Sequence, residues 1–296
     1  MYADQFLKRM KKNLPGIFLI LFFLIVVASC EIINPAEPVP SYLHFNSIAL
    51  QTDTATQGSS SNRITDVWLY VDDQPLGAYE MPVRIPVLKE GNHEIKIRAG
   101  VMVNGIAATR VYYPFYNFFT ATVNLSSGSV LDISPVVTYY SGTVFSLNEN
   151  FSSTGNLFSN TTLSDTTIQI INNSSDCFEN QTAKVYLDEQ HTVFECASVN
   201  ALSLPTNGHP VYIEMNYKTN TEFTVGVFVI TSTQVNNIPV ITVRINSDWK
   251  KIYINLSEAT SSNPTALGFK PYIHMVRNSA TGDSQLFLDN IKVVHF

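Results

Sequence analysis

The sequence predicts an all-β protein made of two β-sandwich domains. Short segments in which hydrophobic and polar residues alternate occur along most of the chain, whereas patterns that indicate helices are almost absent. Turn residues separate these segments, for example at Asn207-Gly208 and at Thr281-Gly282-Asp283. Many short strands divided by such turns are typical of sandwiches and not of folds that alternate strands with helices.

Each expected strand is identified by the pattern of its own residues. In the first half, Ile95 and Ile97 share one face of the segment 94–98, and the charged side chains of that segment share the other. The segment 51–62 is rich in Ser, Thr, Gln and Gly and is expected to form a mobile loop between two early strands. In the second half, the expected strands include 211–217, 223–230, 240–245, 251–256 and 286–294.

The N-terminal segment has the pattern of a secretory signal. Four basic residues between Lys8 and Lys12 precede an apolar run of eleven residues, Ile17 to Val27. This run is too short to span the bilayer core of about 30 Å as a helix. Small residues then directly precede Cys30.

Composition divides the chain into four parts. Three prolines without apolar periodicity follow Cys30, which predicts an extended tether. A composition shift near Tyr140, followed by a stretch dense in Asn, Ser and Thr, places the boundary between the domains at 141–146. The predicted parts are a signal peptide at 1–29, a tether at 30–41, and β-sandwiches at 42–145 and 146–296.

The charge and the scattered histidines exclude several classes of function. The formal net charge is −6, and charged residues make up 14% of the chain, so a nucleic-acid partner is not expected. The six histidines show no metal-binding spacing, no serine has the flanking glycines of a nucleophile turn, and no glycine loop for phosphate is present. The chain is therefore predicted not to be an enzyme, and no cofactor is certain.

Two cysteines remain apart from Cys30. Cys177 and Cys196 would lie in an oxidising compartment, where an even pair predicts a disulfide. The alternative is two separate buried thiols, and the sequence leaves both open.

The residues Val27-Ala28-Ser29-Cys30 resemble the lipobox of bacterial lipoproteins. In that family the cysteine is acylated and becomes the mature N-terminus. The resemblance implies that the acyl chains on Cys30 hold the protein in the outer membrane, in a Gram-negative bacterium of Bacteroidota type, with the leaflet left open. The alternative is an ordinary signal peptide with a chance cysteine.

The first sandwich resembles the PEGA-type and carboxypeptidase-regulatory-like domains of bacterial envelope proteins. The resemblance covers about residues 64–100 and rests on the hairpin Val71 to Gly77, then Pro82, and then the run that begins at Glu90. Asp73 stands where a turn glycine is usual, and aspartate tolerates the left-handed conformation that such a turn needs. The resemblance implies a spacer or interaction module without activity.

The second sandwich resembles a jelly roll of the carbohydrate-binding-module type. The resemblance rests on Phe178 before the opening strand, the paired strands 211–217 and 223–230, Trp249, and the closing strand 286–294. It implies a structural calcium held by the carboxylates of Glu179 and Asp289. Trp249 is expected to pack in the core.

Two groups of side chains are candidate binding sites. Rings and amides on one sheet face suit sugars, and the alternative is an ordinary solvent-facing sheet surface; the candidate ligand face is Tyr212, Glu214, Asn216, Tyr253, Asn255, Tyr272 and His274. Aromatic side chains are also frequent in protein interfaces, and the alternative is core packing in the first sandwich. The candidate partner patch is Tyr112, Tyr113, Phe115, Tyr116, Phe118 and Phe119.

The function expected from these features is that of a non-catalytic envelope lipoprotein that binds a glycan or a protein partner. The alternative is a purely structural subunit of a larger outer-membrane complex, such as secretion, uptake or adhesion machinery. A groove rich in rings on the second sandwich would favour the first hypothesis. A flat apolar patch around Tyr112 to Phe119 would favour the second.

Overall fold

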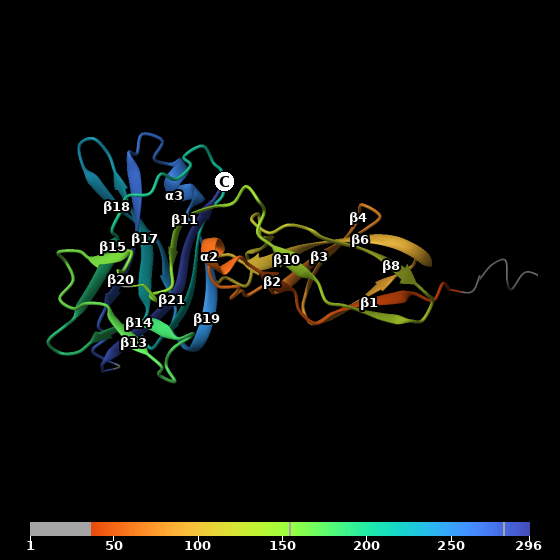
Figure 1. Ribbon diagram of the computed structural model, residues 1–296, viewed down its shortest axis with the longest axis horizontal. Helices are drawn as coiled ribbons and strands as arrows, with labels where there is room; N and C mark the ends of the chain where they lie inside the picture. Colours follow the sequence, from red (N-terminus) through yellow and green to blue (C-terminus); the bar gives the residue numbers. More distant parts are fainter. Residues whose placement is uncertain (1–36, 154, 281) are drawn as a thin grey trace, which may run out of the picture.

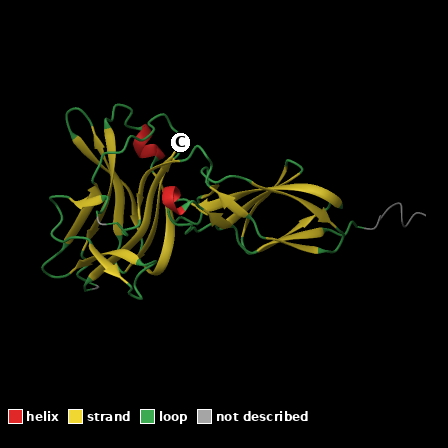
Figure 2. Cartoon of the chain, in the orientation of Figure 1, coloured by secondary structure: helices red, strands yellow, loops and turns green. Residues whose placement is uncertain are grey.

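The computed structural model describes residues 37–153, 155–280 and 282–296, which form two β-sandwich domains (Figures 1 and 2). The prediction of an all-β fold with two sandwiches is confirmed. The predicted signal peptide and Cys30 lie outside the described residues. Two short helices, α2 (Thr54–Gln57) and α3 (Ser257–Ser261), are the helices of the described part of the chain. None of the helices in that part is long and apolar enough to cross a membrane.

The first domain is a small sandwich whose core is formed by alternating side chains. On β6, Ile95 and Ile97 are fully buried, whereas the preceding residue Glu94 faces solvent. The alternation of hydrophobic and polar residues in this segment predicts that arrangement. One sheet has the order β4-β3-β6-β7 with β8 also on β6, and it faces the sheet β5-β1-β9 and the pair β2–β10. The strands are β1 (Ser41–Phe45), β2 (Ala49–Gln51), β3 (Asp66–Val71), β4 (Gln74–Glu80), β5 (Val83–Val87), β6 (Gly91–Met102), β7 (Arg110–Tyr112), β8 (Phe119–Leu125), β9 (Val130–Ile133) and β10 (Val136–Thr138).

The hairpin between β3 and β4 shows why aspartates stand at its turn. Asp72 and Asp73 have φ values of 51° and 61°, the left-handed conformation that a two-residue hairpin turn needs. The Asp72 carboxylate also accepts hydrogen bonds from Lys89, His93 and the Glu94 backbone. The hydrogen bonds from Lys89 and His93 lower the pKa of Asp72 to about 2.

The second domain is a jelly roll made of a six-stranded and a five-stranded sheet. The six-stranded sheet has the order β13-β14-β21-β16-β19 with β11 also on β21, and the other has the order β12-β15-β20-β17-β18. The core lies between them and includes Phe194, Met215, Val225 and Leu288. The strands are β11 (Val144–Glu149), β12 (Phe158–Asn160), β13 (Gln169–Asn172), β14 (Gln181–Leu187), β15 (Val193–Ser198), β16 (Val211–Thr219), β17 (Phe223–Ile230), β18 (Val235–Val243), β19 (Asn246–Asn255), β20 (Gly268–Val276) and β21 (Ser284–His295).

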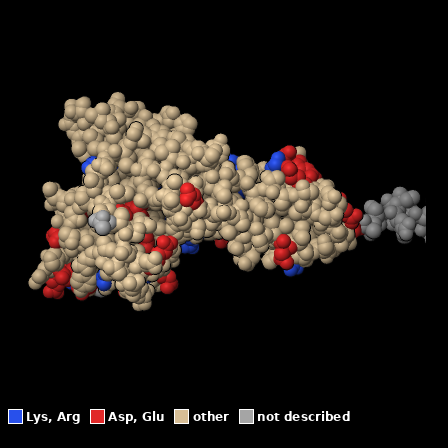
Figure 3. Space-filling view, viewed as in Figure 1, with Lys and Arg blue, Asp and Glu red and all other residues tan. Residues whose placement is uncertain are grey.

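The two domains are joined end to end (Figure 1). The first described residues lie at the tip of the first domain that is farthest from the jelly roll, and the opposite end packs on the outer face of the six-stranded sheet. The segment expected to be a mobile loop is docked there, because Lys292 Nζ donates to the Ser59 carbonyl at 2.7 Å and Asn216 Nδ2 donates to Ser61 Oγ at 2.9 Å. Figure 3 shows that few Lys, Arg, Asp and Glu side chains lie on the face of the molecule in view.

Candidate functional site

Four residues of the predicted ligand face lie in the interface between the domains. Tyr212, Glu214 and Asn216 on β16 and Tyr253 on β19 do share one sheet face, but the first domain covers it. Glu214 is 0% exposed and Tyr253 is 1% exposed. The prediction that these side chains face solvent is therefore wrong, because strand alternation shows which side chains leave the core of one domain and not what a second domain covers.

Asn255 joins this group, since it ends β19 two residues after Tyr253 and pairs with Tyr212 on β16. Tyr272 and His274 do not join it, because they lie on β20 in the five-stranded sheet. Tyr272 stacks on Phe228 with 4.7 Å between ring centroids, and burial raises the pKa of Tyr272 to about 12. The seven residues therefore do not form a single face, since the sequence does not show to which sheet each strand belongs.

The predicted partner patch is divided by the fold. Its three buried members, Tyr113, Phe115 and Tyr116, pack in the cluster that joins the first domain to the outer face of the jelly roll. These three side chains of the patch therefore contact the second domain of the same chain. The remaining members are Tyr112 (39% exposed), Phe118 (52% exposed) and Phe119, which is partly buried against the core of the first domain.

The predicted disulfide is absent, since Cys177 and Cys196 are both free. Cys177 lies between β13 and β14, and its Sγ is 3.5 Å from the Ile171 carbonyl oxygen. Cys196 lies on β15 in the other sheet, where burial raises the pKa of its thiol. Of the two alternatives the separate thiols hold, because Cys177 lies in a loop of the six-stranded sheet and Cys196 on a strand of the other sheet, which the nineteen-residue spacing alone does not reveal.

The two carboxylates that the jelly-roll resemblance assigns to calcium do lie close together. Asp289 is fully buried and accepts hydrogen bonds from Thr182 Oγ1 at 3.0 Å and from the Asn290 backbone at 2.7 Å. Burial raises the pKa of Asp289 to about 6, and the neighbouring charge of Glu179 adds to this effect. Within the described residues, no group of three His, Cys, Asp or Glu side chains is gathered. A cation at this pair would therefore need hydroxyl, carbonyl or water oxygens to complete its shell.

A row of aromatic side chains occupies the half of the six-stranded sheet that the first domain leaves uncovered. We name this group the ring row: Phe178, Trp249, Phe287 and Tyr186. The rings of Phe178 and Trp249 are 5.3 Å apart between centroids, and those of Trp249 and Phe287 are 6.4 Å apart. Lysine ammonium groups bridge the row, with Lys218 Nζ at 4.5 Å from the Phe287 centroid and Lys184 Nζ at 5.9 Å from the Tyr186 centroid.

Strand alternation places the ring row on the outer side of the sheet. On β14, Val185 is fully buried in the core, so its neighbours Lys184 and Tyr186 point outward. On β19, Trp249 shares its side with Tyr253, whereas Ile252 points into the core. The expectation that Trp249 packs in the core is therefore wrong, and the period of two along β19 is the signal that could have corrected it.

Polar groups surround a groove of about 310 Å³ beside the ring row. Lys218 Nζ forms an ion pair with Asp176 at 2.6 Å, and this hydrogen bond lowers the pKa of Asp176. Trp249 Nε1 donates to the Asp176 carbonyl at 3.2 Å, which fixes the indole. Asn220 and Gln285 also line the groove. The arrangement therefore offers flat apolar surfaces next to ammonium, carboxylate and amide groups.

Comparisons with known proteins return only distant structural similarity. No protein-family model matches the chain, and no curated protein sequence matches it. A carbohydrate-binding module of the β-sandwich superfamily is similar at 15% identity and a TM-score of 0.32, over 77% of this chain and 84% of that one. The family 30 carbohydrate-binding module of a cellulosomal cellulase of Clostridium thermocellum is similar at 15% identity and a TM-score of 0.33, over 51% and 92%.

A further similar structure comes from a bacteriophage protein. The enzymatically active domain of tailspike protein 4 of bacteriophage CBA120 has 8% identity and a TM-score of 0.35, over 53% of this chain and 20% of that one. At such identities and TM-scores, the function of this chain has to be argued from its own residues.

Proposed function

We propose that the protein is a non-catalytic, lipid-anchored binding protein of the cell envelope that holds a glycan on the ring row. The observation that carries this proposal is a set of three partly exposed rings, Phe178, Trp249 and Tyr186. They lie with the buried ring of Phe287 on the uncovered half of the six-stranded sheet, and two lysines bridge them. These rings lie beside the groove that Phe287 lines, and an aromatic surface on the second sandwich favours a glycan-binding protein over a purely structural subunit.

The chemistry of the ring row suits a sugar chain. Aromatic faces pack against the C–H faces of sugar rings, and placed polar groups orient the hydroxyls. Lys218, Asp176 and Asn220 supply such groups beside Phe287. Because the rings form a line and not a closed pocket, the site fits several consecutive sugar units better than a single one. An open face desolvates its ligand only in part, so the affinity is expected to lie between about micromolar and millimolar.

Binding is expected to depend on the outward rings of the row. Tyr186→Ala and Trp249→Ala should each weaken retardation of the mature protein on polysaccharide affinity gels by about tenfold, because each removes a stacking surface. Tyr112→Ala is the matched control, since Tyr112 is an exposed ring of the first domain, and it should migrate like the wild type. The absence of retardation on every polysaccharide of a broad panel would contradict the proposal.

The arrangement of the domains suits presentation of the ring row away from a membrane. The first domain separates the first described residues from the jelly roll (Figure 1). In our proposal, an acyl group on Cys30 anchors the chain in the outer membrane, and the first domain acts as a spacer.

Removal of the acylation site is expected to release the protein. Cys30→Ala should move it from the membrane pellet to the soluble fraction, because a chain without acyl groups retains no anchor of sufficient strength. Immunoblots of fractions washed at high salt measure this distribution. Cys177→Ala is the control and should remain in the pellet. A Cys30→Ala protein that still pellets would show that the anchor lies elsewhere.

We also propose that Glu179 and Asp289 hold a structural calcium. The proposal is supported by two adjoining carboxylates, one of them buried, with a raised pKa for Asp289. A divalent cation would offset the cost of keeping both carboxylates ionised.

A second candidate function, a structural subunit of an envelope complex, is favoured by one exposed patch of the first domain. Arg98 lies over the rings of Tyr112 and Phe118, at 3.5 Å and 4.6 Å from their centroids. Rings and arginine are common at protein interfaces. If Tyr112→Ala lost a co-purifying protein but kept its retardation on polysaccharide gels, the result would indicate that the chain has both roles.

A further inference from the structure

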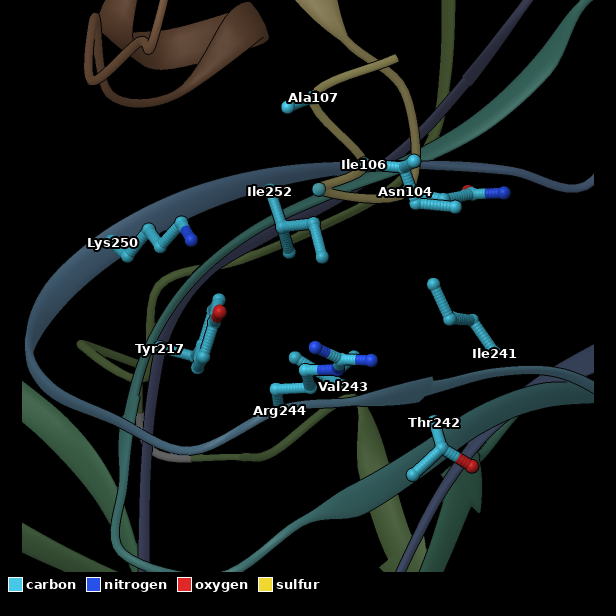
Figure 4. Close-up of a pocket in the computed structure, with 11 residues that line it drawn as sticks. Asn104, Ile106, Ala107, Tyr217, Ile241, Thr242, Val243, Arg244, Lys250 and Ile252 are labelled. Atoms are coloured by element: carbon cyan, nitrogen blue, oxygen red, sulfur yellow. The ribbon is translucent and has the colours of Figure 1, made fainter. Parts of the chain in front are cut away.

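A second cavity lies where the first domain meets the edges of the two jelly-roll sheets. The loop between β6 and β7 covers this space, and it is held there because the Asn104 backbone donates to the Tyr253 carbonyl at 2.7 Å and the Asn255 backbone donates to Asn104 Oδ1 at 3.0 Å. The cavity has a volume of about 440 Å³. This volume is within the roughly 300–1,000 Å³ usual for small-molecule sites. We name it the junction cleft (Figure 4).

The floor of the junction cleft is apolar. β18 and β19 are edge strands of the two sheets, so the side of the jelly-roll core opens between them. Val243 and Ile252, which belong to that core, line the cavity together with Ile241, and Ile106 of the covering loop lies opposite. Figure 4 shows these apolar side chains and the loop around one common space.

The two charged side chains that line the junction cleft are both cationic. Arg244 and Lys250 line it, and no Asp or Glu does so. Lys250 also lines a small adjoining cavity together with Arg63 and Lys251. Burial lowers the pKa of Lys250, and the positive charge of Arg63 lowers it further. Four cationic side chains thus surround one region of a chain in which only 14% of the residues are charged.

Three of these four cations lack a counter-charge in the part of the chain that the structure describes. Among residues 37–296 that the structure describes, Arg63, Arg244 and Lys250 take part in no ion pair. Lys251 is 4% exposed, and its Nζ has no hydrogen-bond partner in this part of the chain. Its one ion pair, with Glu214 Oε2, is 3.5 Å long. An anion in the junction cleft would supply the counter-charge that Arg244 and Lys250, which line it, lack.

Protection of a sheet edge explains only part of this arrangement. An inward-pointing lysine on an edge strand prevents unwanted pairing with other chains, which would account for Lys250 alone. It does not account for Arg244 directly after β18 of the other sheet, for Arg63 from the first domain, or for a cavity with an apolar floor.

We propose that the junction cleft binds a small organic anion with a compact apolar body and a carboxylate or phosphate head. The head lies between Lys250 and Arg244, and the apolar body lies on Val243, Ile241 and Ile252. This site is separate from the ring row and does not depend on glycan binding. Because residues of both domains form the cleft, the bound anion would also hold the two domains together.

The proposal is tested by calorimetric titration of the full mature protein with octanoate, octyl phosphate, octanol and inorganic phosphate. At least one of the two amphiphilic anions is expected to bind with one-to-one stoichiometry and about tenfold more tightly than octanol or inorganic phosphate. Whichever anion binds more tightly identifies the head group. Binding of neither anion, or equal binding of octanol, would overturn the proposal, as would inorganic phosphate binding alone.

Variants locate the site. The double variant Arg244→Gln, Lys250→Gln should weaken binding of the anion by about tenfold and leave binding of octanol unchanged. The control Arg84→Gln, Lys270→Gln removes the same charge outside the cleft and should change affinity by less than about twofold. Ala107→Trp, at an exposed loop position, should block entry. Equal losses in both double variants would show non-specific attraction and overturn the proposal. Tyr186→Ala should leave anion binding unchanged, which separates this result from a failure of glycan binding.

Discussion

Replacement of Glu214 by glutamine is expected to lower the free energy of unfolding by about 3–5 kcal/mol, the usual cost of removing one partner from a buried ion pair. The Glu214 carboxylate accepts hydrogen bonds from Tyr113 at 2.8 Å and from Tyr139 at 2.9 Å, and it lies 3.5 Å from Lys251 Nζ. Lys292 is also buried nearby, and burial lowers the pKa of Lys292 to about 8, against the opposing effect of Glu214. Without this carboxylate, two ammonium groups would remain between the domains with little to offset their charge.

The two tryptophans make this experiment specific to the interface. Trp68 lies in the first domain and Trp249 in the second, so variants that retain one or the other report on each domain during urea unfolding. The two domains are expected to unfold together in the wild type, and apart in Glu214→Gln. Glu222→Gln, which changes an exposed carboxylate, is the control and should stay within about 0.5 kcal/mol of the wild type. A loss below about 1 kcal/mol in Glu214→Gln would mean that water reaches the charges.

Acidification from about pH 7 to about pH 5 is expected to stabilise the calcium-free protein, which is the opposite of the usual behaviour of a paired carboxylate. The pKa of Asp289 is raised from 3.8 to about 6 in the folded state. The folded state therefore binds the proton more tightly than the unfolded state. The resulting stability is fully present below the unfolded value and is lost as the pH rises through about 6. The full shift from 3.8 to about 6 corresponds to roughly 3 kcal/mol, and the interval from pH 7 to pH 5 yields less than half of it.

Thermal melts across this pH range, in excess chelator and in calcium chloride, measure this effect. In chelator, Asp289→Asn should flatten the rise in melting temperature on the acidic side. In calcium chloride, the wild type should melt at a higher temperature near pH 7, because a ligand at about 100 times its Kd contributes about 2.7 kcal/mol. Asp248→Asn, at an exposed position, is the control and should keep the wild-type profile. Identical wild-type melting temperatures with and without calcium would contradict the calcium proposal. The pH profile in chelator tests the raised pKa of Asp289 independently of calcium.

The sequence was sufficient to predict the fold class and the direction of many side chains, because alternation is a property of each strand. Ile95 and Ile97 are buried as expected, and Tyr212, Glu214 and Tyr253 do lie on the outer side of their sheet. What covers that side depends on contacts between residues more than a hundred positions apart, such as Tyr113 with Glu214. No local pattern contains this information.

The ring row also could not be predicted from local sequence patterns, because it depends on the order of the strands in the sheet. Its members come from β14, β19, β21 and the segment before β14, and only the strand order makes them neighbours. Trp249 could have been placed outward from the alternation along β19. Its proximity to Phe287 could not, because the sequence does not show that β16 alone separates their strands.

The interface between the domains also bears on how this chain could be divided or recombined. Tyr212, Tyr253 and Val294 of the jelly roll pack in the same cluster as Tyr113 and Phe115 of the first domain. A jelly roll cut free near residue 143 would present these apolar side chains to water, together with the charges of its outer face. Each domain therefore covers apolar side chains of the other that would be exposed if the domains were separated. A homologous sandwich could replace either domain only if its surface were complementary to the remaining domain. The two domains are therefore expected to be inherited together in evolution.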